Sequence, residues 1–150
     1  MPLLQATGAR RDMPFHHPAA TAPIKVLGYF DDGFPAALRE IPDPPLVLYY
    51  MGNLDWLGKP VIAVVGARRA TSLGRMVARD MGREFAKFGV HVVSGLAYGI
   101  DVAAHQGALE ALDAGYVQGG TSAVLGSGLA QVYPQRHASV VRRLCAGGGG

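Results

Sequence analysis

The sequence predicts an α/β fold: a Rossmann-like, doubly wound parallel sheet that is incomplete, with three recognisable βα units. Three apolar runs, at 61–65, 90–95 and 121–126, each reach a glycine, and each is followed by a segment with helical character. A right-handed helical crossover is the usual way to join two parallel strands, so this alternation is typical of parallel sheets. A chain of 150 residues also fits one domain.

The first unit begins with Val61–Val65, whose β-branched residues predict a strand that is buried on both faces. The next segment repeats apolar residues at spacings of four and three, which predicts a helix that buries this face. Gly89 is expected to end that helix at the C′ position. The repeated apolar residues are Leu73, Val77, Met81, Phe85 and Phe88.

The second unit combines the strand at 90–95 with a helix at 100–112, in which three alanines allow close packing. The third combines the strand at 121–126 with a helix at 136–145. A sheet of three strands leaves its outer strand as an open edge, so we expect the chain to expose apolar surface.

Two segments of different composition precede this core. Residues 1–23 hold four prolines and no apolar period, which predicts a loose leader. Residues 24–58 are expected to be a lead-in that packs on the core, with a short helix at 35–40 and a strand at 46–51. The partial Rossmann-like domain then covers 59–146.

Composition restricts both location and chemistry. No apolar stretch approaches the roughly 18 residues of a membrane span, and the N-terminus lacks the pattern of a signal peptide, so we expect a cytoplasmic protein without membrane contact. The single cysteine, Cys145, excludes an internal disulfide and a multi-thiolate zinc site. The formal net charge is +3, and seven basic against two acidic residues fall within 59–90, which suits a phosphate-bearing partner.

The candidate site lies where the three strands end. Ligands of open parallel sheets collect at the carboxyl ends of the strands, and glycine there lets backbone N–H groups approach an anion. The following helix N-termini add donors, and Arg68 and Arg69 add full charges beside the first loop. The sequence therefore predicts a phosphate-binding cradle, whose candidate residues are Gly66, Ala67, Arg68, Arg69, Thr71, Gly74, Arg75, Ser94, Gly95, Gly99, Asp101, Gly126, Ser127 and Gly128.

Other chemistry is poorly supported. The loops lack Gly-x-Gly-x-x-Gly and Gly-Lys-Ser/Thr, so we expect neither a dinucleotide cofactor nor P-loop hydrolysis, and no cofactor at all. Ser94 and Ser127 have no evident base, so we expect no catalytic residue and no enzyme. Asp101 and His105 are two metal-type ligands without a third, which favours Asp101 as a helix cap or loop anchor over a metal site. His91, within an apolar strand, is interpreted as a core histidine.

Basic residues repeat every four positions on the first core helix and so share one face. For Arg83 and Lys87 the favoured interpretation is a solvated face that Asp80 and Glu84 partly balance. Arg75 lies in the first turn of this helix, near the cradle, and it stays open whether it belongs to the solvated face or to the phosphate site. The repeated residues are Arg75, Arg79, Arg83 and Lys87.

A family resemblance rests on Val64–Arg68, Val93–His105, Gly119–Leu129 and the pair Tyr133-Pro134. Together with Pro42–Tyr49 in the lead-in, these segments resemble the DprA/Smf family of DNA-processing proteins over about residues 34–137. The resemblance implies a Rossmann domain that binds single-stranded DNA and helps to load the RecA recombinase in natural transformation, competence and DNA recombination. It also implies that Arg68 of Gly66-Ala67-Arg68 contacts phosphate in the DNA pocket, and it leaves a homodimer open.

The chain departs from the family pattern at Tyr98, where many members have arginine, and at Ala130, where aspartate is usual. Residues 147–150 form a glycine tail where the family continues, so we expect a module truncated within the Rossmann domain. Two alternatives stay open. One is a Rossmann-type nucleotide-binding enzyme of the phosphoribohydrolase kind, although the chain lacks that family's Pro-Gly-Gly-x-Gly-Thr segment. The other is a nonfunctional truncated fragment.

Overall fold

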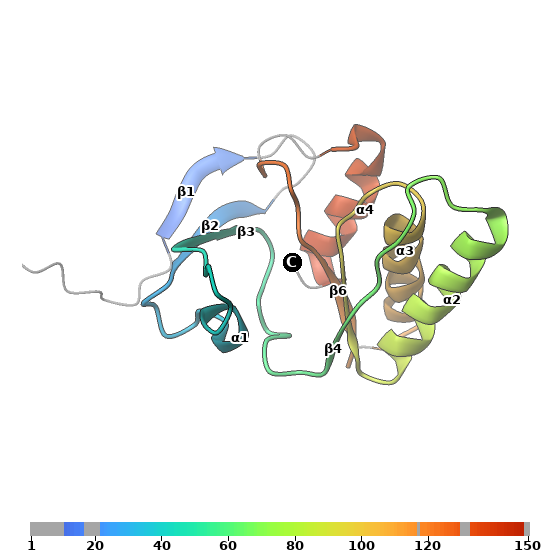
Figure 1. Cartoon of the computed structure of the whole chain (residues 1–150), viewed down its shortest axis with the longest axis horizontal. Coiled ribbons are helices and arrows are strands. Elements are labelled where there is room, and N and C mark those ends of the chain that lie inside the picture. The colour runs from blue at the N-terminus through green and yellow to red at the C-terminus, as the bar shows by residue number, and fades with distance from the viewer. Residues whose placement is uncertain (1–10, 17–21, 117, 130–132, 149–150) are drawn as a thin grey trace, which may run out of the picture.

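The computed structural model of the chain describes residues 11–16, 22–116, 118–129 and 133–148. These residues form two three-stranded sheets (Figure 1). The first sheet is antiparallel, in the order β1 (Arg11–His16), β2 (Pro23–Gly28) and β3 (Val47–Tyr50). The second sheet is parallel, in the order β4 (Val61–Ala63), β5 (His91–Ser94) and β6 (Gly120–Ala123).

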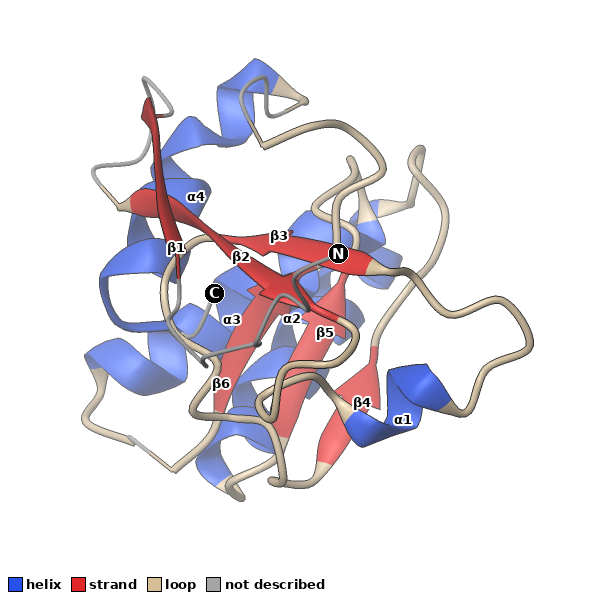
Figure 2. Cartoon of the chain, turned by 90° about the vertical axis from the view of Figure 1, so that its left-hand side faces the viewer, coloured by secondary structure: helices blue, strands red, loops and turns tan. Residues whose placement is uncertain are grey.

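The helices arrange these sheets in layers. Helices α2 (Ser72–Lys87) and α3 (Ile100–Asp113) lie on one side of the parallel sheet, and the antiparallel sheet lies on the other (Figures 1 and 2). The predicted α/β class with a Rossmann-like parallel sheet is confirmed. No helix of the described residues is long and apolar enough to pass through a bilayer. The remaining helical segments are α1 (Ala36–Arg39), η1 (Gln135–His137), α4 (Ala138–Arg143) and η2 (Leu144–Gly148).

Small residues hold α2 and α3 close together. A Cβ atom on Gly82 of α2 would overlap the backbone of Ala104 in α3, and one on Gly107 of α3 would overlap the backbone of Arg79. The apolar layer between this helix pair and the sheet consists of Val64, Ala86, Val92, Ala104, Ala108 and Ala111. The pair therefore packs as one unit and brings both helix N-termini to the carboxyl ends of β4 and β5.

The prediction that Val61–Val65 is buried on both faces is wrong. Only Val61–Ala63 is strand, and Val61 and Val65 are 48% and 70% exposed. The reason is the strand order, which places β4 at an edge and makes β5 the central strand, whose Val92 is fully buried. A β-branched run indicates a strand, but it carries no information about which neighbours the strand has.

The prediction that α2 buries its face of large apolar residues is also wrong. Its small residues Ala78, Gly82 and Ala86 are buried, whereas most of the large apolar side chains are exposed. Close packing against α3 selects the small residues for the inner face, so the large ones turn away from the core. Several of them line an apolar groove of about 610 Å³ beside β4, which includes Ile62, Val64, Leu73, Val77, Met81 and Ile100. The predicted helix end is confirmed, because Gly89 has φ of +77°.

The loose leader expected for residues 1–23 does not hold for Arg11–His16, which form β1. This strand pairs with β2, with Arg11 opposite Val26 and Asp12 opposite Lys25. Backbone hydrogen bonds to a neighbouring strand order such a segment without any apolar period. Residues 1–10, 17–21 and 149–150 lie outside the described residues, and the first two residues of the glycine tail, Gly147 and Gly148, belong to η2.

Two buried histidines contact the central part of the parallel sheet. His91 Nε2 lies 2.8 Å from Ser122 Oγ, and the Trp56 ring stacks on the imidazole at 4.5 Å between centroids. His105 Nδ1 lies 2.6 Å from Thr121 Oγ1. Burial lowers the pKa of both histidines to about 4. The interpretation of His91 as a core histidine is confirmed, since it is 2% exposed.

We expect acid to destabilise the protein between pH 6.5 and 4. The folded pKa of each histidine is about 4 against 6.5 when unfolded, so the unfolded chain binds more protons in this range. The stabilisation is complete above pH 6.5, and roughly 1.4 kcal/mol per pH unit is lost for each histidine as the pH falls. Urea unfolding of the wild type, His91→Gln and His105→Gln from pH 7 to 4.5 measures this slope. If the unfolding free energy fell equally with pH in all three proteins, the two histidines would not be the cause of the acid destabilisation.

We expect the apolar groove to bind the dye ANS. Val77→Ser with Met81→Ser removes two exposed apolar side chains and leaves the buried face of α2 intact, so ANS fluorescence should fall. Leu46→Ser is the matched control, because Leu46 is exposed but does not line the groove. Equal losses in the two variants would show that the dye does not bind in this groove.

Candidate nucleic-acid interface

The candidate site is a cleft of about 400 Å³ at the carboxyl ends of the parallel strands. The loops that follow β4, β5 and β6 meet here because parallel strands end at the same edge of a sheet. The segment before η1 closes a further side of the cleft. The lining residues are Arg68, Gly95, Ala97, Tyr98, Leu125, Gly126, Ser127, Tyr133 and Pro134.

Asp101, in the first turn of α3, joins the first two loops. Its Oδ1 accepts a hydrogen bond from the Gly66 N–H, and its Oδ2 accepts one from the Gly95 N–H, each at 3.2 Å. The side chain is nearly buried, with 6% of the residue exposed. The prediction of Asp101 as a loop anchor is therefore confirmed, and the carboxylate fixes the distance between the loops after β4 and β5.

Several backbone donors that the sequence assigned to phosphate already have partners. The N–H groups of Gly66 and Gly95 donate to Asp101, and that of Gly74 donates to Thr71 Oγ1 at 3.0 Å. Thr71 is the N-cap of α2, so its hydroxyl serves the helix. The expectation that these three N–H groups are free to hold phosphate does not hold, because each donates to a side chain of the protein itself.

Other predicted residues contact the backbone of the loops and so support the site. Ser94 is buried, and its hydroxyl donates to the Val64 carbonyl at 2.6 Å, which ties β5 to the end of β4. Gly99 has φ of +82°, and a Cβ atom there would overlap the backbone of Ala67 and Arg68. Only glycine allows the start of α3 to approach the first loop this closely. The cleft is thus shaped by three predicted residues that do not line it, namely Ser94, Ala67 and Gly99.

Of the predicted residues, the cleft lining includes Arg68, Gly95, Gly126 and Ser127. Thr71 and Gly74 line the apolar groove, and Arg75 bonds locally to the Ala70 carbonyl and the Ser72 hydroxyl. Arg69 and Gly128 are exposed outside both linings. The aromatic residues Tyr98 and Tyr133 were not among the predicted ligands, although both belong to segments that carry the family resemblance.

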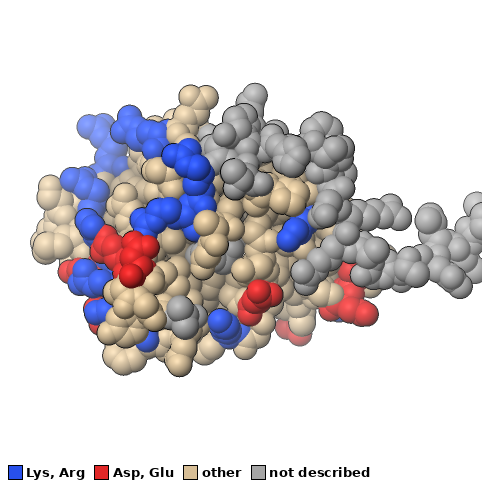
Figure 3. Space-filling view, turned by 180° about the vertical axis from the view of Figure 1, so that it is seen from behind, with Lys and Arg blue, Asp and Glu red and all other residues tan. Residues whose placement is uncertain are grey.

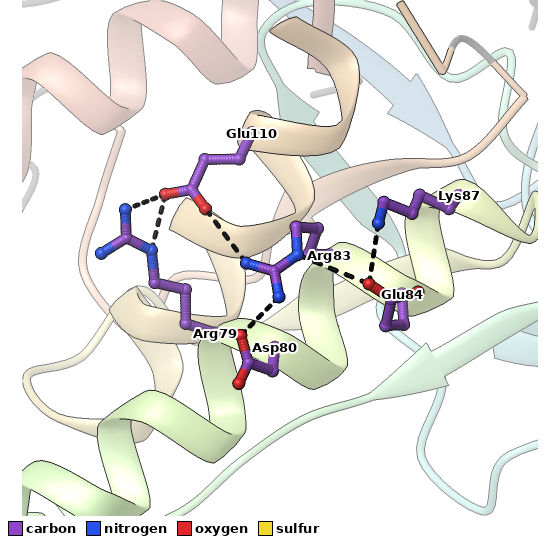
Figure 4. Close-up of polar contacts among 6 residues, drawn as sticks. All are labelled: Arg79, Asp80, Arg83, Glu84, Lys87 and Glu110. Carbon is purple, nitrogen blue, oxygen red and sulfur yellow. Dashed lines mark hydrogen bonds and ion pairs between the residues drawn. The ribbon is translucent and has the colours of Figure 1, made fainter. Parts of the chain in front are cut away.

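Three basic residues of α2 form ion pairs with carboxylates. Arg83 lies 2.6 Å from Asp80, Lys87 lies 2.9 Å from Glu84, and Arg79 pairs with Glu110 of α3 (Figure 4). The hydrogen bond from Lys87 lowers the pKa of Glu84. The predicted balanced, solvated face for Arg83 and Lys87 is confirmed.

Arg68, by contrast, is exposed, and within the described ranges no carboxylate lies at ion-pair distance from it or from Arg69. Seen from behind, most Lys and Arg side chains in view gather on the side of the molecule where α2 lies, with one group of acidic side chains among them and others elsewhere on this face (Figure 3). The cleft therefore carries an uncompensated positive charge on its first loop.

We expect Asp101→Ala to destabilise the fold. It leaves two N–H groups at the loop ends without their acceptor, which costs on the order of 1 to 3 kcal/mol of unfolding free energy for each group that stays dry. Asp113→Ala is the control, since Asp113 forms an exposed ion pair with Arg143 that contributes about 1 kcal/mol or less. Urea unfolding at pH 7 compares them. A loss for Asp101→Ala no larger than the control's would show that the loops do not depend on this carboxylate.

Comparisons with known proteins agree on one family. The family model described as DNA recombination-mediator protein A matches residues 25–149. The DNA processing protein DprA of Streptococcus pneumoniae is 43% identical over 110 residues, which cover 70% of this chain and 35% of that protein. Protein Smf of Synechocystis is 39% identical over 122 residues, which cover 79% of this chain and 29% of that protein. The chain thus spans about a third of the length of these curated relatives.

Solved structures give the same result. The X-ray structure of DprA from Streptococcus pneumoniae superposes with a TM-score of 0.66 at 39% identity, covering 75% of this chain and 37% of that one. A structure of DNA processing protein A from Helicobacter pylori, which concerns the single-stranded DNA binding mode of that protein, gives a TM-score of 0.71 at 28% identity. It covers 91% of this chain and 55% of that one. This chain therefore belongs to the DNA recombination-mediator protein A family, the DprA/Smf proteins.

Proposed function

We propose that this chain binds single-stranded DNA in the cleft, through the sugar-phosphate backbone and without sequence preference. The observation that carries the proposal is Arg68, an exposed arginine that lines a cleft at the ends of three strands and has no carboxylate partner among the described residues. The family relationship supports it, because the related Helicobacter pylori protein binds single-stranded DNA. The role is one in DNA processing during recombination.

The chemistry of the lining suits a phosphate. A guanidinium offers two parallel N–H donors to two phosphate oxygens, and such charge-assisted bonds are among the stronger ones in proteins. The Ser127 hydroxyl, on the opposite loop, is a further donor in the same cleft. Since Asp101 fixes the loops after β4 and β5 before any ligand arrives, little ordering remains to be done when DNA binds.

The lining also favours binding over catalysis. Among the described residues, the cleft is lined by one arginine, one serine, two tyrosines and otherwise apolar or glycine positions, which include no carboxylate or imidazole as a general base. Contacts of this kind position a backbone and do not read base edges. From the family resemblance, we further propose that the bound strand is handed to the RecA recombinase, as in natural transformation.

We expect affinity for oligo-dT to fall with salt and to depend on Arg68. The slope of log K against log salt should be about −0.7 per neutralised phosphate. Arg68→Ala should weaken binding by roughly 1 to 3 kcal/mol, whereas Arg68→Lys keeps the charge and should lose less. Fluorescence anisotropy at a fixed salt concentration measures both variants.

The matched control is the double variant Arg83→Ala with Lys87→Ala. It removes two positive charges instead of one, but these are already balanced by Asp80, Glu84 and Glu110 and lie outside the cleft. Its loss should therefore be smaller than that of Arg68→Ala. Equal losses would mean that diffuse charge holds the DNA, and salt-independent or absent binding would contradict the proposal itself.

A further inference from the structure

Strand β4 is an open edge of the parallel sheet, because β5 is its one neighbour among the described strands (Figure 2). The Val64 N–H donates to the Val93 carbonyl at 3.0 Å, so the backbone of Val64 bonds toward β5. Successive residues of a strand direct their N–H and C=O groups to opposite sides. Three residues therefore direct these groups away from β5, toward the open side of the strand, namely Val61, Ala63 and Val65.

This edge carries little of the protection that edge strands usually have. Proteins guard such edges with charged side chains, bulges or a covering segment. Residues 60–67 include no charged side chain, and Val61, Ala63 and Val65 are all exposed. An uncharged strand edge that is open to solvent is a template on which a further strand can pair.

The apolar groove of about 610 Å³ lies beside this edge and is lined by both β4 and α2. Its helical side includes three exposed residues that repeat every four positions, about 6 Å along a helix. The outward residues of the strand repeat every two positions, about 6.6 Å along a strand. Each row is thus symmetric about its central residue, Val77 in the helix and Ala63 in the strand, at nearly the same spacing. The helical row consists of Leu73, Val77 and Met81.

We propose that two copies of this chain associate through β4, with the two strands antiparallel about a two-fold axis at Ala63. In this register Ala63 pairs with its own copy and Val61 pairs with Val65, so the outward N–H and C=O groups of all three residues gain partners. The same axis brings the two helical rows together beside the joined strands, with Leu73 of one copy near Met81 of the other. The surface is therefore complementary to itself, as a two-fold interface requires.

The size of this surface fits a reversible dimer. Five apolar side chains, each about half exposed, and the strand backbone offer on the order of 500 Å² per copy, so two copies reach the roughly 1,000 Å² that a specific interface needs. An interface at this lower limit should form and dissociate with protein concentration. The five side chains are Val61, Val65, Leu73, Val77 and Met81.

Charge distinguishes this association from DNA binding. The uncharged segment is bounded by Lys59 and Arg68, and antiparallel pairing brings Lys59 of one copy near Arg68 of the other. Salt screens this repulsion and leaves the apolar contact in place, so dimerisation should strengthen with salt, whereas DNA binding weakens. The inference does not depend on the proposed function, and the two clefts lie at opposite ends of the joined sheet because the strands run in opposite directions.

The test uses residue 63, which the axis places opposite itself. Ala63→Lys or Ala63→Glu sets like charges face to face and should weaken dimerisation by about 5-fold or more. Mixing the two variants sets opposite charges face to face and should restore a mixed dimer. Val47→Lys is the matched control, since Val47 is an exposed residue of β3, an edge strand of the other sheet. Sedimentation velocity at increasing protein concentration measures the mass, and circular dichroism checks the fold.

Three results would overturn the proposal. They are a wild type that stays monomeric at several hundred micromolar, a dimer that Ala63→Lys weakens no more than Val47→Lys does, and two folded variants whose mixture fails to associate. ANS gives an independent signal, because the dimer buries the groove. ANS fluorescence per chain should fall as the wild-type concentration rises, and it should stay constant for Ala63→Lys. A monomer that binds no ANS would mean that a different occupant covers the groove, which also excludes the second copy.

Discussion

The arrangement of the cleft depends on one buried carboxylate. Asp101 accepts hydrogen bonds from the backbone of both Gly66 and Gly95, and these glycines begin the loops that follow neighbouring strands. Asp101 lies in the first turn of α3, so its two hydrogen bonds fix the position of the helix start relative to both loops and both strand ends. The backbone of Ala67 and Arg68 packs directly against Gly99, and this contact also fixes the first loop against the start of α3. The side chain of Arg68 therefore starts from a fixed backbone position.

The same molecule shows two uses of arginine. On α2, Arg79, Arg83 and Lys87 pair with carboxylates of their own helix and of α3, so their charges cancel close to the surface. At the strand ends, Arg68 has no such partner among the described residues, and its charge is available to a ligand. The number of basic residues in a segment is thus a poor measure of binding. What matters is which of them the fold leaves uncompensated and directs into a cleft.

The sequence allowed the βα order, the end of α2 at Gly89, the anchoring role of Asp101 and the balanced face of α2 to be predicted, because each follows from local spacing. The position of β4 at an edge could not be predicted, since strand order is set by contacts between distant segments. The buried face of α2 was misjudged for a related reason. Gly82 and Gly107 control how closely two helices approach, and this tertiary requirement overrides the apolar period of one helix. In the candidate site, Arg68 was predictable from its position after a strand, but the hydrogen bonds that occupy the N–H groups of Gly66 and Gly95 required three-dimensional structure.

The edge position of β4 has a consequence for how the cleft deforms. This strand has three residues and pairs with β5 alone, so its backbone hydrogen bonds are fewer and more exposed to solvent than those of the central strand. Local opening of a protein begins in such segments, which exchange amide hydrogens faster than the core. Arg68 follows β4 after a short connection, whereas Tyr98 and Tyr133 are attached to a buried strand and an anchored turn. The wall of the cleft that carries Arg68 therefore relies on the contacts of Asp101 and Gly99 with its loop, because the edge strand itself supplies few hydrogen bonds.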